Sequence, residues 1–213
     1  TRHALLRADA PSADGFGLAI FAGMFGFAAL MPFTLLLSRM VTLNQAKAMT
    51  QPPDMPMITG FLLLVMASIV AGVAEEAGFR GYMQGPIERR HGPTVGIVVV
   101  GLLFGLAHFR HHPGLATLGM LPFYIFPAAV YGLIAYATDS IVPGIVLHVV
   151  GDVFVLTPWW LTGQGEWQLT AEAPRLIWET GADGAFWGAL AAFVILGAVA
   201  VAAFMSLLGQ RSA

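Results

Sequence analysis

Two adjacent glutamates and an arginine interrupt a long apolar stretch of this chain. Glu75, Glu76 and Arg80 follow the run MITGFLLLVMASIVAGVA, which begins at Met57. An ionised side chain costs at least a few kcal/mol inside a bilayer unless it is paired, hydrated or used. On a helix, Glu76 and Arg80 share a face and can form an ion pair, whereas Glu75 points about 100° away. The spacing predicts a structural pair and a second carboxylate, Glu75, that remains available for chemistry.

Two further polar motifs lie within apolar runs downstream. His108 follows Phe104 by four residues, and His148 precedes Asp152 by four residues. The second spacing places an imidazole and a carboxylate on one helix face. Counted at about 1.5 Å per residue along each helix, these groups and Glu75 lie at depths that allow them to meet. We therefore predict one hydrated pocket formed by three helices.

A carboxylate beside an imidazole is the smallest set of groups that can activate water. Glu75 would act as general base, and a histidine would orient the water or protonate the leaving group. The remaining histidine and Asp152 could donate hydrogen bonds to a developing oxyanion. Taken singly, each group has a structural explanation: Glu76 and Arg80 could simply be an ion pair, and Asp152 could simply hold His148. Their occurrence on three helices favours a site, because buried ionisable groups usually mark one.

The composition indicates the elements that must position these groups. Hydrophobic residues make up 57% of the 213 residues and charged residues 10%, against about 25% charged in soluble domains. Several apolar runs approach the ~20 residues that cross a bilayer. The prediction is an all-α, polytopic membrane helix bundle, a single domain over residues 1–213 with a motif-bearing core at about 57–156. About six spans are expected, at residues 16–40, 57–84, 93–109, 118–137, 143–156 and 182–208.

The segments between these spans carry further expectations. GPIERRHGP, residues 85–93, reads as a short basic loop, and His91, His111 and His112 as surface histidines. Trp159, Trp160, Trp167 and Trp178 fall within residues 158–180, which predicts a segment at the membrane interface. Six spans place both termini on one side, and a small excess of flanking Arg there favours the cytoplasm of a bacterial-type cell.

Charge and cysteine content exclude several classes of function. The net charge is −2 and no basic patch is present, which argues against a nucleic-acid partner. Cysteine is absent, and this excludes disulfides, thiolate nucleophiles and cysteine-ligated metals. The expected partners are the lipid bilayer and a protein or peptide substrate.

In order and spacing, the three motifs resemble those of the CPBP family, the type II CAAX prenyl endopeptidases and the bacteriocin-processing or Abi-type membrane proteases. The motifs are EExxxR, FxxxH and HxxxN/D, carried here by Glu75, Glu76 and Arg80, by Phe104 and His108, and by His148 and Asp152. The resemblance covers about residues 57–154. It implies an intramembrane endopeptidase that cleaves a prenylated protein, a leader peptide or another membrane peptide. By the family's pattern, Glu75 and His108 would activate the water, while His148 and Asp152 would form the oxyanion hole.

Asp152 departs from the CAAX enzymes, which have asparagine at this position. An ionised aspartate repels an oxyanion, so Asp152 must be protonated, hold His148 or bind a metal. A Zn²⁺ held by His108, His148 and a carboxylate of Glu75 or Asp152, with one position open for water, is chemically reasonable. The chain lacks HExxH or another established zinc motif. We therefore rank a metal-free mechanism without a cofactor above the zinc-dependent one.

Two functions other than proteolysis are also compatible with buried carboxylates in a membrane protein. The chain could be a non-catalytic scaffold or immunity protein, or a proton-coupled carrier that uses its buried carboxylates as a relay. The presence of every motif residue argues against the scaffold. A carrier would more often show paired repeats and broken half-helices, and the sequence shows neither.

Overall fold

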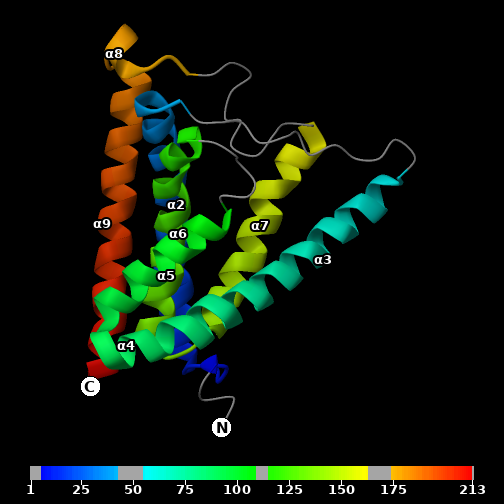
Figure 1. Ribbon diagram of the computed structural model, residues 1–213, viewed down its shortest axis with the longest axis vertical. Helices are drawn as coiled ribbons and strands as arrows, with labels where there is room; N and C mark the ends of the chain where they lie inside the picture. The colour runs from blue at the N-terminus through cyan, green and yellow to red at the C-terminus, as the bar shows by residue number, and fades with distance from the viewer. Residues whose placement is uncertain (1–5, 43–54, 109–114, 163–173, 213) are drawn as a thin grey trace.

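Every regular element in the described part of the chain is helical. The computed structural model describes residues 6–42, 55–108, 115–162 and 174–212 (Figure 1). The elements are α2 (Ala13–Met40), α3 (Met57–Glu75), the π-helix η1 (Glu76–Gln84), α4 (Gly85–His91), α5 (Pro93–Ala107), the 3₁₀-helix η3 (Leu115–Met120), α6 (Leu121–Thr138), α7 (Val142–Thr162), α8 (Ile177–Thr180) and α9 (Gly184–Ser212). This architecture confirms the predicted all-α helix bundle.

Five helices in the described residues are long and apolar enough to cross a membrane. They are Ala13–Met40, Met57–His91, Leu118–Thr138, Val142–Thr162 and Gly184–Arg211. The third predicted span, residues 93–109, corresponds to α5, which is apolar but has only 15 residues, fewer than the ~20 that cross the hydrocarbon core. The chain is therefore an integral membrane protein with five candidate spans and one shorter apolar helix.

The basic loop predicted at residues 85–93 is helical, so this prediction was wrong. The helix that begins at Met57 continues through η1 and α4 to His91 and ends at Gly92, whose φ is 87°. Pro86 lies near the junction of η1 and α4, inside this continuous helix, where it removes one backbone N–H donor. Arg89 and Arg90 lie in its last turn, where positive charge complements the helix dipole.

The fifth predicted span also extends further than expected, because α7 continues through Pro158 to Thr162. Trp159 and Trp160 of the tryptophan-rich segment therefore belong to α7. Trp178 lies on α8 with 65% of its surface exposed, and Trp167 falls outside the described residues. A proline inside a membrane helix is tolerated when neighbouring groups satisfy the freed carbonyl.

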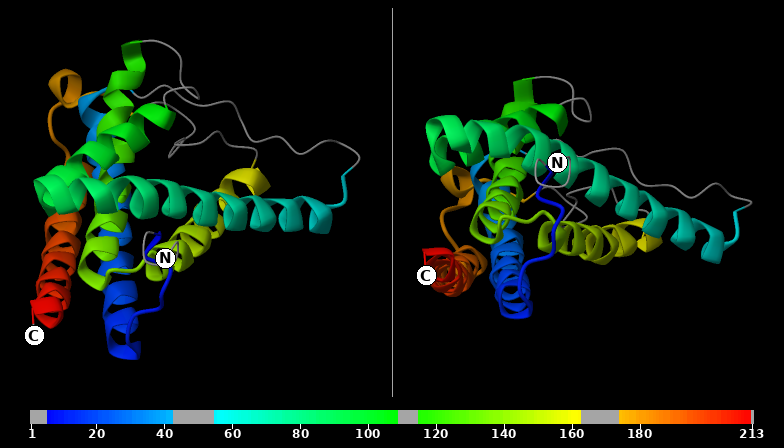
Figure 2. Two further views of the ribbon diagram at one scale, coloured as in Figure 1. Left: turned by 60° about the horizontal axis from the view of Figure 1, so that its bottom comes forward. Right: turned by 90° about the horizontal axis from the view of Figure 1, so that it is seen from below.

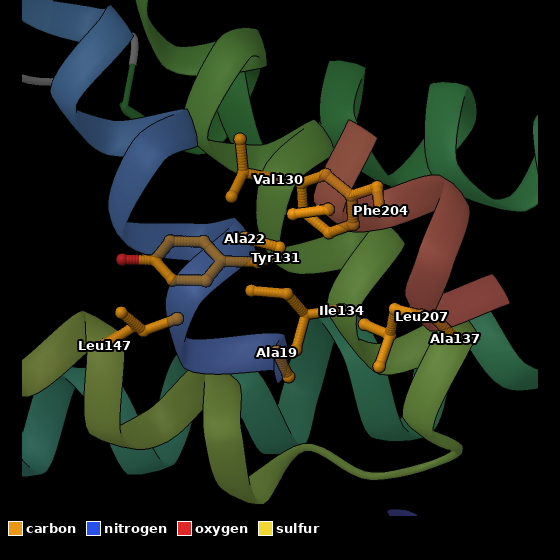
Figure 3. Packing of buried hydrophobic residues seen from close by; sticks show 10 residues of the cluster. Ala19, Ala22, Val130, Tyr131, Ile134, Ala137, Leu147, Phe204 and Leu207 are labelled. Atoms are coloured by element: carbon orange, nitrogen blue, oxygen red, sulfur yellow. The ribbon is translucent and has the colours of Figure 1, made fainter. Parts of the chain in front are cut away.

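Small residues let the helices of the bundle approach one another closely. The core where α2, α6, α7 and α9 meet is shown in Figure 3 and comprises Ala19, Ala22, Val130, Tyr131, Ile134, Ala137, Leu147, Ala203, Phe204 and Leu207. A Cβ at Gly23 would lie 2.3 Å from a methyl carbon of Leu147, and one at Gly26 would lie 3.0 Å from Val130. Close backbone approach of this kind drives helix association in lipid.

The helices divide into an upright group and an oblique one. α2 packs along α9 and against α6, while α3 leans away from them and packs against α7 (Figures 1 and 2). The first described residues, α4 and the end of α9 lie at one end of the molecule (Figure 1). At the start of α9, Asp183 accepts a hydrogen bond of 2.8 Å from Arg39 of α2. This bond, with a further one from the N–H of Phe186, lowers the pKa of Asp183 below its usual value.

Candidate active site

The two glutamates lie where their helix changes from α to π geometry. α3 ends at Glu75, and the nine-residue π-helix η1 begins at Glu76. Most π-helical segments in proteins are single wide turns within an α-helix, and they occur frequently at functional sites. The side chain of Glu75 is 29% exposed and that of Glu76 1%. The two neighbours therefore face different surroundings, as their helical separation predicts.

The ion pair predicted from the sequence spacing is present and fully buried. An Nη atom of Arg80 lies 3.0 Å from Oε1 of Glu76, and both residues are 0% exposed. Arg80 also donates to the carbonyl oxygen of Ala128 on α6 at 3.3 Å. Its guanidinium carbon lies 4.7 Å from the ring centre of Phe104 and 4.9 Å from that of Tyr131. The charge of Arg80 is thus compensated by a carboxylate, a carbonyl and two aromatic faces.

His148 links both glutamates to the helix that carries Asp152. Its Nδ1 lies 3.0 Å from Oε1 of Glu76, while its Nε2 lies 3.8 Å from both Glu75 Oε2 and Asp152 Oδ2. The ring stacks on Tyr131 at 4.9 Å with an angle of 15° between the planes. Because an ionised carboxylate only accepts hydrogen bonds, the contact with Glu76 places a proton on Nδ1. Nε2 is therefore the nitrogen that faces Glu75 and Asp152.

Glu75 and Asp152 form the accessible side of this cluster. Their side chains are 29% and 32% exposed, against 8% for His148. A separation of 3.8 Å is too long for a direct hydrogen bond, but a water molecule or a polar substrate atom can bridge groups at such distances. The arrangement can therefore place one reacting atom within reach of two carboxylates and an imidazole.

His108 lies at the end of α5 and joins the cluster through an aromatic ring. Its Nδ1 lies 2.9 Å from the carbonyl oxygen of Phe104, and its ring stacks on Tyr124 at 4.7 Å. The ring of Phe104, 4.4 Å from that of His108, is the one beneath Arg80. The carbonyl can only accept, so the proton lies on Nδ1, and the Nε2 of a neutral ring is left as an acceptor. The Phe104 to His108 spacing thus fixes the tautomer of this histidine.

The described residues contain no group of side chains with metal-binding geometry. Within them, no three or more His, Cys, Asp or Glu side chains are grouped so that they could hold a metal ion. His108, His148, Glu75 and Asp152, the ligands of the zinc alternative, do not form such a group there. His91 is exposed at the end of α4, as predicted for a surface histidine, and His111 and His112 fall outside the described residues.

Several residues around the site carry no sequence signal of their role. Tyr131 contacts both Arg80 and His148, yet in the sequence it is one aromatic residue in an apolar run. Gly72 and Gly144 allow the close approach of α3, η1 and α7. A Cβ at Gly72 would lie 2.8 Å from Val149, and one at Gly144 would lie 3.1 Å from Oε2 of Glu76. A glycine shows that something approaches closely but does not show what.

Comparison with known proteins agrees with the three motifs. Residues 57–154 match the family model described as "Type II CAAX prenyl endopeptidase Rce1-like". No curated protein and no solved structure gave a significant match to the chain. The matched range runs from the start of α3 into α7 and contains the glutamate pair, both site histidines and Asp152. Residues 57–154 are therefore similar to the domain of the Rce1-like type II CAAX prenyl endopeptidases, the family that the motifs resemble.

Proposed function

We propose that this protein is an intramembrane endopeptidase that hydrolyses a peptide bond of a membrane-associated protein or peptide. The Rce1-like domain implies protease activity of the CAAX type. The observation that carries the proposal is the position of His148, whose Nε2 lies 3.8 Å from both Glu75 and Asp152 on the accessible side of the cluster. Buried ionisable groups gathered in this way are costly in a membrane and usually serve a function.

In the proposed reaction, Glu75 removes a proton from water as the water oxygen attacks the peptide carbonyl carbon. His108 helps to orient the water, and one of these two groups delivers a proton to the leaving amine as the C–N bond breaks. The oxyanion formed from the carbonyl accepts hydrogen bonds from His148 and Asp152. His148 already donates from Nδ1 to Glu76, so donation from Nε2 requires its imidazolium form. Asp152 donates only when it is protonated.

The proposal is tested with purified protein in detergent and a set of membrane-soluble peptides, including prenylated CAAX peptides and leader peptides. We expect specific cleavage, mapped by mass spectrometry, that is insensitive to a metal chelator. The control is the Glu75→Gln variant prepared in parallel, which removes any contaminating protease from consideration. Cleavage that is lost with chelator and restored by Zn²⁺ would favour the zinc-dependent form. A wild-type protein that cleaves none of the peptides would contradict the proposal.

Variants of Asp152 distinguish the metal-free mechanism from the zinc-dependent one in the same assay. As an oxyanion donor it should be replaceable by asparagine, so Asp152→Asn keeps its activity, whereas Asp152→Ala loses a factor on the order of 10²–10³. As a zinc ligand it should not be replaceable, because an amide is a poorer ligand than a carboxylate. An inactive Asn variant that has also lost a stoichiometric metal by elemental analysis would overturn the metal-free mechanism.

We also propose that the end of the molecule carrying α4 and the end of α9 faces the cytoplasm of a bacterial-type cell. Arginines concentrated at this end support the orientation: Arg89 and Arg90 lie in the last turn of α4, Arg211 lies in the last turn of α9, and Arg7 pairs with Glu88 of α4. The chain has no cysteine, and both Arg90 and Glu179 are exposed. An impermeant thiol reagent should label Glu179→Cys in intact cells and Arg90→Cys only after lysis. The reverse labelling would invert the topology.

A further inference from the structure

The segment that precedes α2 is anchored against the helices that carry the site. The carbonyl oxygen of Arg7 accepts a hydrogen bond of 2.8 Å from the N–H of Ile141, next to the start of α7. Leu6 lies against η1, where a Cβ at Gly81 would be 3.0 Å from its carbonyl oxygen. A side chain at position 81 would crowd this oxygen, and glycine accommodates the approach. The segment therefore touches both the helix of the two glutamates and the beginning of the helix of His148.

The side chain of Arg7 joins the same two parts of the protein. It is 6% exposed and forms ion pairs with Glu88 of α4 and, at 3.1 Å, with Asp139 of the α6–α7 connection. Glu88 also accepts a hydrogen bond of 2.6 Å from Gln84 of η1, which donates at 2.8 Å to the carbonyl of Gly132 on α6. One guanidinium thus bridges two carboxylates on different elements, which its planar fork can do and an ammonium cannot reproduce.

The backbone at both ends of one of these ion pairs is in an uncommon conformation. Arg7 has a φ of 54° and Asp139 a φ of 50°, and these are the non-glycine residues with positive φ in the described part of the chain. Residues other than glycine rarely adopt a positive φ. Such conformations persist where the surrounding structure over-determines them, and they cluster at functional positions. Here the two strained residues are partners of each other.

We propose that Arg7 is a positioning residue that holds the helix of Glu75 and Glu76 at a fixed position relative to the helix of His148 and Asp152. α4 is the direct continuation of the first helix, and Asp139 lies just before the second. Glu76 and His148 share one hydrogen bond between these helices, but Glu75 has no direct hydrogen bond to His148 at 3.8 Å, so that separation also depends on how the two helices are held elsewhere. The consequence for reaction rate rests on the function proposed above.

The test combines hydrogen exchange with kinetics on Arg7→Ala. Without the bridge, we expect faster amide exchange in residues 76–91 and 138–148 and unchanged exchange in α9, because local opening reports local stability. We expect kcat to fall by a factor on the order of 10–100, as for small misplacements of reacting groups, with KM changed by less than about twofold. Asp139→Asn removes one ion pair of Arg7 and keeps the other, between Arg7 and Glu88. It should give a smaller change of the same kind, and it provides a second variant if Arg7→Ala does not fold.

The matched control is Arg90→Ala, which removes an exposed arginine from α4 itself and should alter neither measurement. Arg7→Lys should restore only part of the lost kcat. Unchanged exchange in both segments in Arg7→Ala and Asp139→Asn would overturn the inference, as would faster exchange with an unchanged kcat. If the wild type hydrolyses no peptide, the proposed function fails, and the exchange result alone decides whether Arg7 holds the two helices.

Discussion

Replacing Glu75 with glutamine is expected to abolish peptide hydrolysis while the protein remains folded. Glutamine has the shape of glutamate but cannot take a proton from water, and general-base catalysis contributes about 10²–10⁴-fold. The loss of stability should be small because the side chain of Glu75 is 29% exposed and its nearest ionic partner, His148 Nε2, is 3.8 Å away. The measurement is the cleavage rate in detergent together with the thermal unfolding midpoint.

The neighbouring residue supplies the control for this expectation. Glu76→Gln is the same chemical change one position along the chain, but it removes a buried charge that contacts both Arg80 and His148. It should therefore lower stability as well as activity. A Glu75→Gln variant that retains most of the wild-type rate would show that another group activates the water. A Glu75→Gln variant as unstable as Glu76→Gln would show that both glutamates are structural.

Replacing Arg80 with alanine is expected to destabilise the protein by about 3–5 kcal/mol, the range found when one partner of a buried ion pair is removed. Arg80 is fully buried, so its loss leaves Glu76 charged beside His148 and opens a void between two aromatic rings. The measurement is denaturant or thermal unfolding in detergent. Arg90→Ala, at an exposed position, should change the unfolding free energy by less than about 0.5 kcal/mol.

A double variant distinguishes two causes of the lower stability of Arg80→Ala: the unpaired buried charge of Glu76 and the lost packing of the Arg80 side chain. Glu76→Leu combined with Arg80→Met removes both charges and refills part of the space, and apolar replacement of a whole buried pair is often neutral or stabilising. It should therefore be more stable than Arg80→Ala, although His148 loses its hydrogen bond to Glu76. A double variant no more stable than Arg80→Ala would mean that packing against Phe104 and Tyr131, and not the stranded charge, dominates.

The sequence by itself determined the helices and the pairs within them. Apolar runs of membrane length predict helices because a lipid-exposed backbone must satisfy its own hydrogen bonds. Pairs four residues apart meet because side chains at i and i+4 share a helix face: Glu76 reaches Arg80, and His148 faces Asp152. The positions of several helix ends differ from those that the sequence predicts. Gly85, Pro86 and Gly92 predict a loop, but the helix that begins at Met57 continues through Pro86 to His91.

The tertiary structure alone decided which of these pairs come together. His148 lies between two glutamates from another helix, Arg80 lies between two aromatic rings, and Arg7 bridges segments that are 81 and 132 residues away in the sequence. Helical periodicity orders side chains around one axis and carries no information about the neighbouring axis. Contact between helices depends on where their small residues allow close approach, as at Gly72 against Val149. Many glycines and alanines in this chain offer such a place, and only packing of the whole bundle selects among them.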